Sequence, residues 1–128
     1  MSTSAINWFE LPTTDFERAV AFYETAFAVS LHRQDFNDEA NAIFPYEQGK
    51  GIGGAVVNSP LSQPGANGPV VYLNAQSAQK LDQILGRVET AGGKVVMPKT
   101  DIGPVGFVAM FLDTEGNRVG LHAEHAEA

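Results

Sequence analysis

The stretch Thr14–Phe27, TDFERAVAFYETAF, carries the clearest helix signal in the chain and decides how the rest is interpreted. Thr14 followed by Glu17 has the pattern of a capping box, which predicts a helix start at Thr14. Apolar side chains then recur at the spacing of one helix face, at Phe16, Val20, Tyr23 and Phe27. The stretch therefore predicts an amphipathic helix with one buried face.

The same apolar stripe returns 65 residues later, at Leu81, Ile84, Leu85 and Val88, and the tripeptide Glu-Thr-Ala at 24–26 returns at 89–91. A segment rich in proline and glycine, 58–69, separates the two copies. A repeat of half the chain length predicts two copies of one supersecondary unit, at about 1–60 and 68–124.

Alternating apolar patterns and turn residues predict the remaining elements. In the first half, strands are expected at 5–11, 29–34, 40–46 and 52–58, with a polar turn at 35–39. In the second half, strands are expected at 69–75, 94–97, 106–112 and 118–123, with a helix at about 77–91 that Gly92 and Gly93 close. Each half thus has the order βαβββ, in an α+β fold.

Composition limits the function classes. The 128 residues are enough for one domain, and no apolar run approaches the roughly 20 residues of a membrane helix. Neither a basic start nor a long apolar segment marks the N-terminus for export, so a cytoplasmic protein is expected. A net charge of −7 without a Lys/Arg cluster argues against nucleic acid and anionic membranes as partners. The absence of cysteine excludes disulfides and thiolate chemistry.

Three stretches resemble the vicinal oxygen chelate superfamily of glyoxalase I, bleomycin-resistance proteins and extradiol dioxygenases. They are FELPTTDFERAVAFYETAF (9–27), YLN (72–74) and VETAGGKVVMPKTDIGPVGFVAMFLDTEGNRVGL (88–121). The resemblance implies that each βαβββ unit forms half of a cup-shaped mixed sheet, with helices outside and a ligand or metal inside. It also implies a homodimer with two-fold symmetry. Ala28 stands where the family usually has the glycine that ends the first helix.

Metal-dependent members of this superfamily carry ligands at one position on the first and last strand of each half. Here those positions fall on Trp8, Val70, Gly120 and either Gly54 or Ala55, none of which has a metal-binding side chain. The sequence therefore predicts no metal and no other cofactor. A displaced site built from Glu10, His122 and Glu124 is the alternative.

Period-two alternation places five side chains on the cup-facing side of the strands: Trp8, Glu10, Tyr72, Asn74 and His122. Tryptophan offers an apolar wall for a ring, and a Glu near a His can exchange protons. These residues are the candidate ligand contacts, and the first hypothesis is metal-free binding of a small apolar or aromatic molecule. The alternatives are a metal-dependent lyase, isomerase or dioxygenase with displaced ligands, and an interaction module whose cup is filled by its own side chains.

Overall fold

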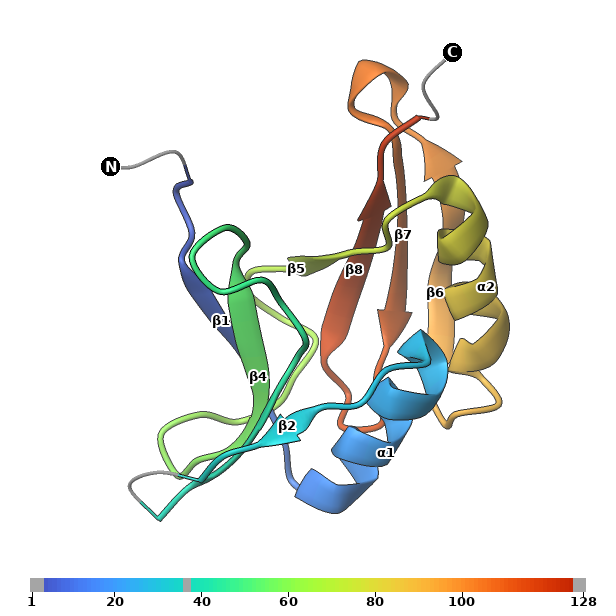
Figure 1. The fold of residues 1–128 in the computed structure, drawn as a ribbon. Coiled ribbons are helices and arrows are strands. Elements are labelled where there is room, and N and C mark those ends of the chain that lie inside the picture. Colours follow the sequence, from blue (N-terminus) through green and yellow to red (C-terminus); the bar gives the residue numbers. More distant parts are fainter. Residues whose placement is uncertain (1–3, 36–37, 126–128) are drawn as a thin grey trace.

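The computed structural model describes residues 4–35 and 38–125. Figure 1 shows the course of the chain through two sheets and two helices. In chain order the elements are β1 (Trp8–Pro12), α1 (Phe16–Phe27), β2 (His32–Arg33), β3 (Ala40–Ile43), β4 (Gly53–Asn58), β5 (Val71–Asn74), α2 (Ala78–Val88), β6 (Lys94–Asp101), the short 3₁₀ helix η1 (Gly103–Val105), β7 (Phe107–Leu112) and β8 (Arg118–Ala123).

The two halves have the same sheet topology. The strand order is β1-β4-β3-β2 in the first sheet and β5-β8-β7-β6 in the second. In each sheet the first strand runs parallel to the last, and the other pairs are antiparallel. This confirms the predicted fold of two βαβββ modules with mixed sheets, which stand open rather than closed into a barrel (Figure 1).

The sheet register shows which faces are buried. Leu11 of β1 lies opposite Val56 of β4, and Leu73 of β5 lies opposite Leu121 of β8. All four side chains are buried in a hydrophobic core that also contains α1 and α2. Each such side chain stabilises the fold by roughly 1.5–3 kcal/mol. Because side chains alternate along a strand, the neighbours of these residues point to the opposite, helix-free face of each sheet.

Helix α1 joins the two halves through aromatic contacts. The ring of Tyr23 lies 5.3 Å from that of Phe44, which follows β3 in the first half. Phe22 and Phe27 lie 5.7 and 6.3 Å from Phe111, which belongs to β7 in the second half. The apolar stripe of α1 thus packs against both sheets. In the described part of the chain, neither helix is long and apolar enough to cross a membrane.

A polar network in the turn between β7 and β8, residues 113–117, also holds the halves together. Buried Asp113 accepts a 2.6 Å hydrogen bond from the hydroxyl of Tyr23 and a 3.0 Å bond from the side chain of Asn117. Asn117 in turn donates to the carbonyl of Pro12 at 2.8 Å and accepts from the amide of Gly65 at 3.0 Å. Burial and the Asp113 carboxylate raise the pKa of Tyr23 well above its ordinary value, which keeps its hydroxyl a donor.

Glu115 of the same turn caps α1 from about a hundred residues away. Its side chain is fully buried, and it accepts bonds of 2.9 and 2.8 Å from the amides of Thr14 and Asp15. Arg18 donates to it at 2.8 Å. Burial of this carboxyl opposes its ionisation, but the hydrogen bonds from Arg18 and Asp15 outweigh burial and lower its pKa from 4.5 to about 2.

The predicted capping box at the start of α1 was wrong. The helix begins at Phe16 with Asp15 as its N-cap, whose carboxylate accepts from the amide of Arg18. The hydroxyl of Thr14 donates to Glu115 instead, and Glu17 forms an ion pair with Arg33. The amide of Thr14 thus donates to Glu115, from the second half, and not to Glu17 as expected.

The C-terminal end of α1 matches the expectation for Ala28. This residue adopts the left-handed conformation, with φ 55° and ψ 48°, and its amide donates to the carbonyl of Glu24. Glycine is the residue that usually ends a helix in this way, because a side chain is strained at positive φ. Ala28 therefore carries a cost that a glycine would remove.

Several predicted boundaries in the first half shift. The strand expected at 5–11 is observed at Trp8–Pro12, where Pro12 is tolerated because β1 is an edge strand. The strand expected at 29–34 is reduced to two residues, since the amide of Leu31 donates to the side chain of Glu24. Strand β3 ends at Ile43, before Pro45. Residues 36–37 of the expected polar turn lie outside the described residues, as do 126–128 of the tail.

In the second half, the expected strand at 69–75 is shorter, at Val71–Asn74, while the one at 94–97 continues to Asp101 through two register shifts. Helix α2 spans Ala78–Val88 with Ser77 as N-cap. The amide of Gly93 donates to the carbonyl of Val88, so the two glycines close the helix as predicted. The last strand begins and ends at the predicted residues.

Candidate functional site

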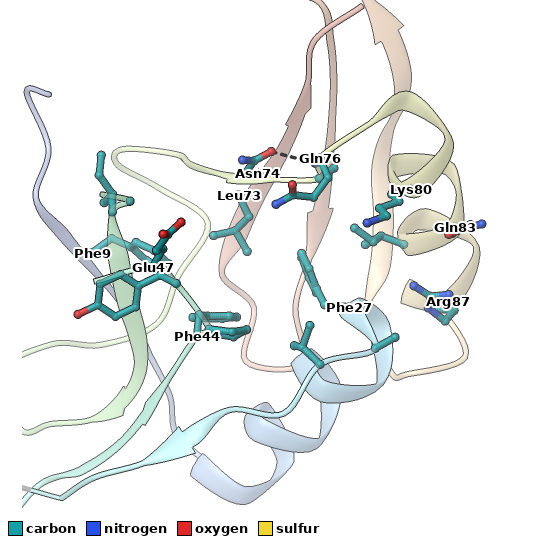
Figure 2. Close-up of a pocket in the computed structure, with 18 of the residues that line it drawn as sticks. Phe9, Phe27, Phe44, Glu47, Leu73, Asn74, Gln76, Lys80, Gln83 and Arg87 are labelled. Atoms are coloured by element: carbon teal, nitrogen blue, oxygen red, sulfur yellow. Dashed lines mark hydrogen bonds between the residues drawn. The ribbon is translucent and has the colours of Figure 1, made fainter. Parts of the chain in front are cut away.

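A cavity of about 750 Å³ lies between the two halves, and we call it the inter-half cavity. Figure 2 shows its lining, with Phe9 and Phe44 from the first half on one side and Lys80 and Arg87 from α2 on the other. It is large enough for a small organic molecule.

The apolar part of the cavity is aromatic. The ring of Phe9 on β1 lies 5.7 Å from the ring of Phe44, and both are half-buried. Phe27, at the last position of α1, lies between the two walls with Leu73 of β5 (Figure 2). Rings of this kind bury a large area and bind flat apolar groups. This half of the lining suits an aromatic or apolar ligand.

The opposite wall is polar and comes from one face of α2. Lys80, Gln83 and Arg87 are spaced at i, i+3 and i+7, so they lie along the same side of the helix. The Nε of Arg87 donates to the carbonyl of Ala26 at 2.9 Å, which holds its side chain at the end of α1. Asn74 and Gln76 border the cavity where β5 leads into α2.

The five candidates from the sequence, Trp8, Glu10, Tyr72, Asn74 and His122, lie on the helix-free faces of the two sheets. Their strand neighbours, such as Phe9, Leu73 and Leu121, belong to the core or pack against it. The register brings Asn74 opposite His122 and Tyr72 opposite Gly120 in the second sheet. Trp8 and Glu10 lie in the first sheet, opposite Gly53 and Ala55. The candidates thus form two groups, one on each sheet.

Their contacts differ. Trp8 packs edge-on against Tyr46 with ring centres 6.0 Å apart, beside a smaller cavity of about 340 Å³. A ring nitrogen of His122 bonds the carbonyl of Val105 at 2.6 Å. Asn74 accepts a 2.8 Å bond from the amide of Gln76 and borders the inter-half cavity. In the described chain, no ion pair joins Glu10 to His122.

The residues that the structure describes do not fit a metal. Within 4–35 and 38–125, no group of three His, Cys, Asp or Glu side chains could hold an ion, and this includes Glu10, His122 and Glu124. At Gly120, a family ligand position, the ring of Tyr72 lies so close to the backbone that a side chain would collide with it. Glu10 of β1 is paired with Ala55 of β4, just as Tyr72 of β5 is paired with Gly120 of β8. Ala55 is therefore the residue of the first sheet that corresponds to Gly120.

Sequence reasoning missed most of the inter-half cavity. The spacing of Lys80, Gln83 and Arg87 beside the apolar stripe of α2 was a readable signal of a polar helix face. No sequence signal marks Phe44 and Phe9 as cavity residues, because their position depends on how the two halves pack. That packing leaves no pattern in the sequence.

Comparison with known proteins places the chain in a family. The model of the Glyoxalase/Bleomycin resistance protein/Dioxygenase superfamily matches residues 5–121. CFP32, which is named as a candidate glyoxylase in Mycobacterium tuberculosis and in Mycobacterium bovis, is 31% identical over 117 residues. The match covers 90% of this chain and 44% of those proteins, so the chain spans less than half the length of these relatives.

Two solved structures show the same fold. TnmS3, an antibiotic binding protein from Streptomyces sp. CB03234, has a TM-score of 0.66 and 26% identity, covering 97% of this chain and 98% of TnmS3. A glyoxalase-related enzyme from Fulvimarina pelagi has a TM-score of 0.70 and 14% identity, covering 94% of this chain and 88% of that enzyme.

Proposed function

We propose that this chain, which belongs to the Glyoxalase/Bleomycin resistance protein/Dioxygenase superfamily, binds a small apolar or aromatic molecule without the help of a metal. The observation that carries the proposal is the inter-half cavity, whose aromatic wall of Phe9, Phe44 and Phe27 faces a polar helix. The lack of fitting metal ligands in the described residues supports the metal-free form.

Two further points support binding over the alternatives. A related protein of nearly the same length, TnmS3, is described as antibiotic binding. An interaction module whose cup is filled by its own side chains is less compatible with the exposed Trp8 and Tyr72 on the cup-facing side of the strands. A metal-dependent reaction with displaced ligands finds no suitable cluster among the described residues.

The test is a fluorescence titration with phenylnaphthylamine, an uncharged aromatic probe, on the chain and on two matched variants. Phe44→Leu removes a ring from the cavity wall, and Tyr72→Leu removes an exposed ring from a helix-free face. Loss of one aromatic contact of about 1.4 kcal/mol weakens binding roughly tenfold. Phe44→Leu should therefore raise the dissociation constant by that factor, while Tyr72→Leu changes it less than twofold.

Absence of saturable probe binding would refute the proposal, provided the thermal midpoint shows that the chain is folded. If Tyr72→Leu instead weakens probe binding more than Phe44→Leu does, the proposed binding site is wrong. That result would place binding at the helix-free faces, where Trp8, Glu10, Tyr72, Asn74 and His122 are the proposed contacts of a closed cup.

We also propose that the chain forms a homodimer. The open sheets have β1, β2, β5 and β6 as edge strands, whose backbone groups can pair with a partner. Exposed apolar side chains on the helix-free faces, such as Trp8 and Tyr72, are available for the same contact. Sedimentation at micromolar concentration should give twice the chain mass of 13.7 kDa, and a monomer mass would contradict the proposal.

A further inference from the structure

We propose that the ligand of the inter-half cavity is an aromatic molecule that carries an anionic group, such as a carboxylate, sulfonate or phosphate. This inference rests on the proposed binding function and adds the chemical class of the ligand. It follows from the charges around the cavity, which are opposite in sign to those of the whole chain.

The charge bias is large for an acidic protein. Of the eight Lys and Arg residues in the chain, three border the cavity: Lys50, Lys80 and Arg87. Of the fifteen Asp and Glu residues, only Glu47 is found among the described lining residues. Lys50 lies 3.2 Å from Glu47, so these two charges offset each other. The cationic excess comes from Lys80 and Arg87 on α2.

Among the described residues, neither of these two cations has an acidic partner. Within the described chain, no carboxylate lies within ion-pair distance of Lys80 or Arg87. Arg87 uses its Nε for the carbonyl of Ala26, which fixes the guanidinium and leaves the Nη groups for another acceptor. A guanidinium held in one orientation loses little entropy when it binds a two-oxygen anion.

The position of the two cations fits one end of an aromatic molecule. Lys80 and Arg87 face the cavity from α2, while Phe9 and Phe44 lie on the opposite wall (Figure 2). A flat ring against the aromatic wall places a substituent toward α2. The amide side chain of Gln76 borders the same region and can donate to anionic oxygens. The cavity thus has an apolar end and a cationic end.

The test compares two probes that differ only in the anionic group: anilinonaphthalene sulfonate and phenylnaphthylamine. One charge-assisted hydrogen bond is worth about tenfold in affinity. The sulfonate should therefore bind about tenfold more tightly than the uncharged probe at low salt, and this advantage should shrink in 0.5 M salt because ions screen exposed charges.

Variants locate the effect. Lys80→Gln should reduce the affinity for the sulfonate several-fold and leave the uncharged probe unchanged. Lys94→Gln is the matched control, because it removes the same charge from an exposed residue of β6 that does not border the cavity. Arg87→Lys, which keeps the charge but not the fork of donors, should weaken the sulfonate less than Arg87→Gln.

The outcomes are distinct. If the uncharged probe binds but the sulfonate gains nothing, or loses as much affinity in Lys94→Gln as in Lys80→Gln, the anionic class is wrong and the proposed binding function stands. If neither probe binds the folded chain, the binding function itself fails. A sulfonate preference that depends on Lys80 and not on Lys94 supports the inference.

Discussion

Two of the regions where the halves of this chain meet differ in their chemistry. At the turn of residues 113–117, the buried carboxylate of Asp113 accepts a hydrogen bond from Tyr23, and that of Glu115 accepts hydrogen bonds from Asp15 and Arg18. At the inter-half cavity, rings and cations face each other across an open space of about 750 Å³. The polar groups at the turn have hydrogen-bond partners within the chain, whereas the side chains around the cavity border open space. We infer that the turn maintains the arrangement of the halves, and that the cavity is the proposed binding site.

The strongest test of this contrast is Asp113→Ala. The variant leaves the hydroxyl of Tyr23 and the side chain of Asn117 without their acceptor in a buried site. Lost hydrogen bonds to a buried charged group should lower the free energy of unfolding by about 4 kcal/mol. Urea denaturation measures this, with the exposed Asp101→Ala as control. Equal stability of the two variants would contradict the central role of the turn.

Glu115→Gln should have the next largest effect, a loss of roughly 2 kcal/mol at pH 7, because a charged acceptor for Arg18 and for two amides is replaced. The folded pKa of Glu115, about 2, lies below its ordinary value of 4.5. Its stabilisation is therefore fully present above pH 4.5 and is lost as the pH falls towards 2.

Urea denaturation at a series of pH values tests whether the stabilisation by Glu115 is lost at low pH. The difference between the chain and Glu115→Gln should shrink steadily as the solution becomes more acidic. A difference that stays constant over this range would show that the carboxylate charge of Glu115 contributes nothing.

A smaller change is expected at the rim of the cavity. Ala28→Gly removes the strain of a side chain at φ 55° and should raise stability by about 0.5–1 kcal/mol. Ala21→Gly, at an exposed position inside α1, is the matched control and should lower stability by a similar amount. Thermal unfolding of both variants measures the pair. The same sign for both would contradict the assigned left-handed cap.

The smallest expected effect is that of chelators. Because no group of metal-binding side chains occurs in the described residues, EDTA should leave the thermal midpoint and probe binding unchanged. Elemental analysis accompanies this measurement. Near one zinc, iron, manganese or nickel per chain, lost together with binding on chelation, would contradict the metal-free proposal.

Local patterns were sufficient to predict the order of helices and strands, while the mixed sheets were implied by the family resemblance. The stripe of Phe16, Val20 and Tyr23 and its return at Leu81 depend on residues within one helix, where periodicity is informative. The start of α1 was missed because its cap, Glu115, lies about a hundred residues away in the sequence. No spacing rule links a helix N-terminus to a turn in the other half.

The candidate site was less predictable for the same reason. Alternation along β1 and β5 identifies Trp8 and Tyr72 as residues of the helix-free faces, because it depends only on strand geometry. The inter-half cavity depends instead on the angle at which the two modules pack. Residues such as Phe44 and Arg87 become neighbours of a common space only through that packing.

The most direct test of binding in the inter-half cavity is an amide NMR titration with phenylnaphthylamine. We predict that shift changes will concentrate on Phe44, Leu73 and Ile84, which border the cavity, and will leave Gly120 and His122 unaffected. Changes centred on Trp8, Tyr72 and His122 would contradict this account, as would a folded chain whose spectrum does not respond to the probe.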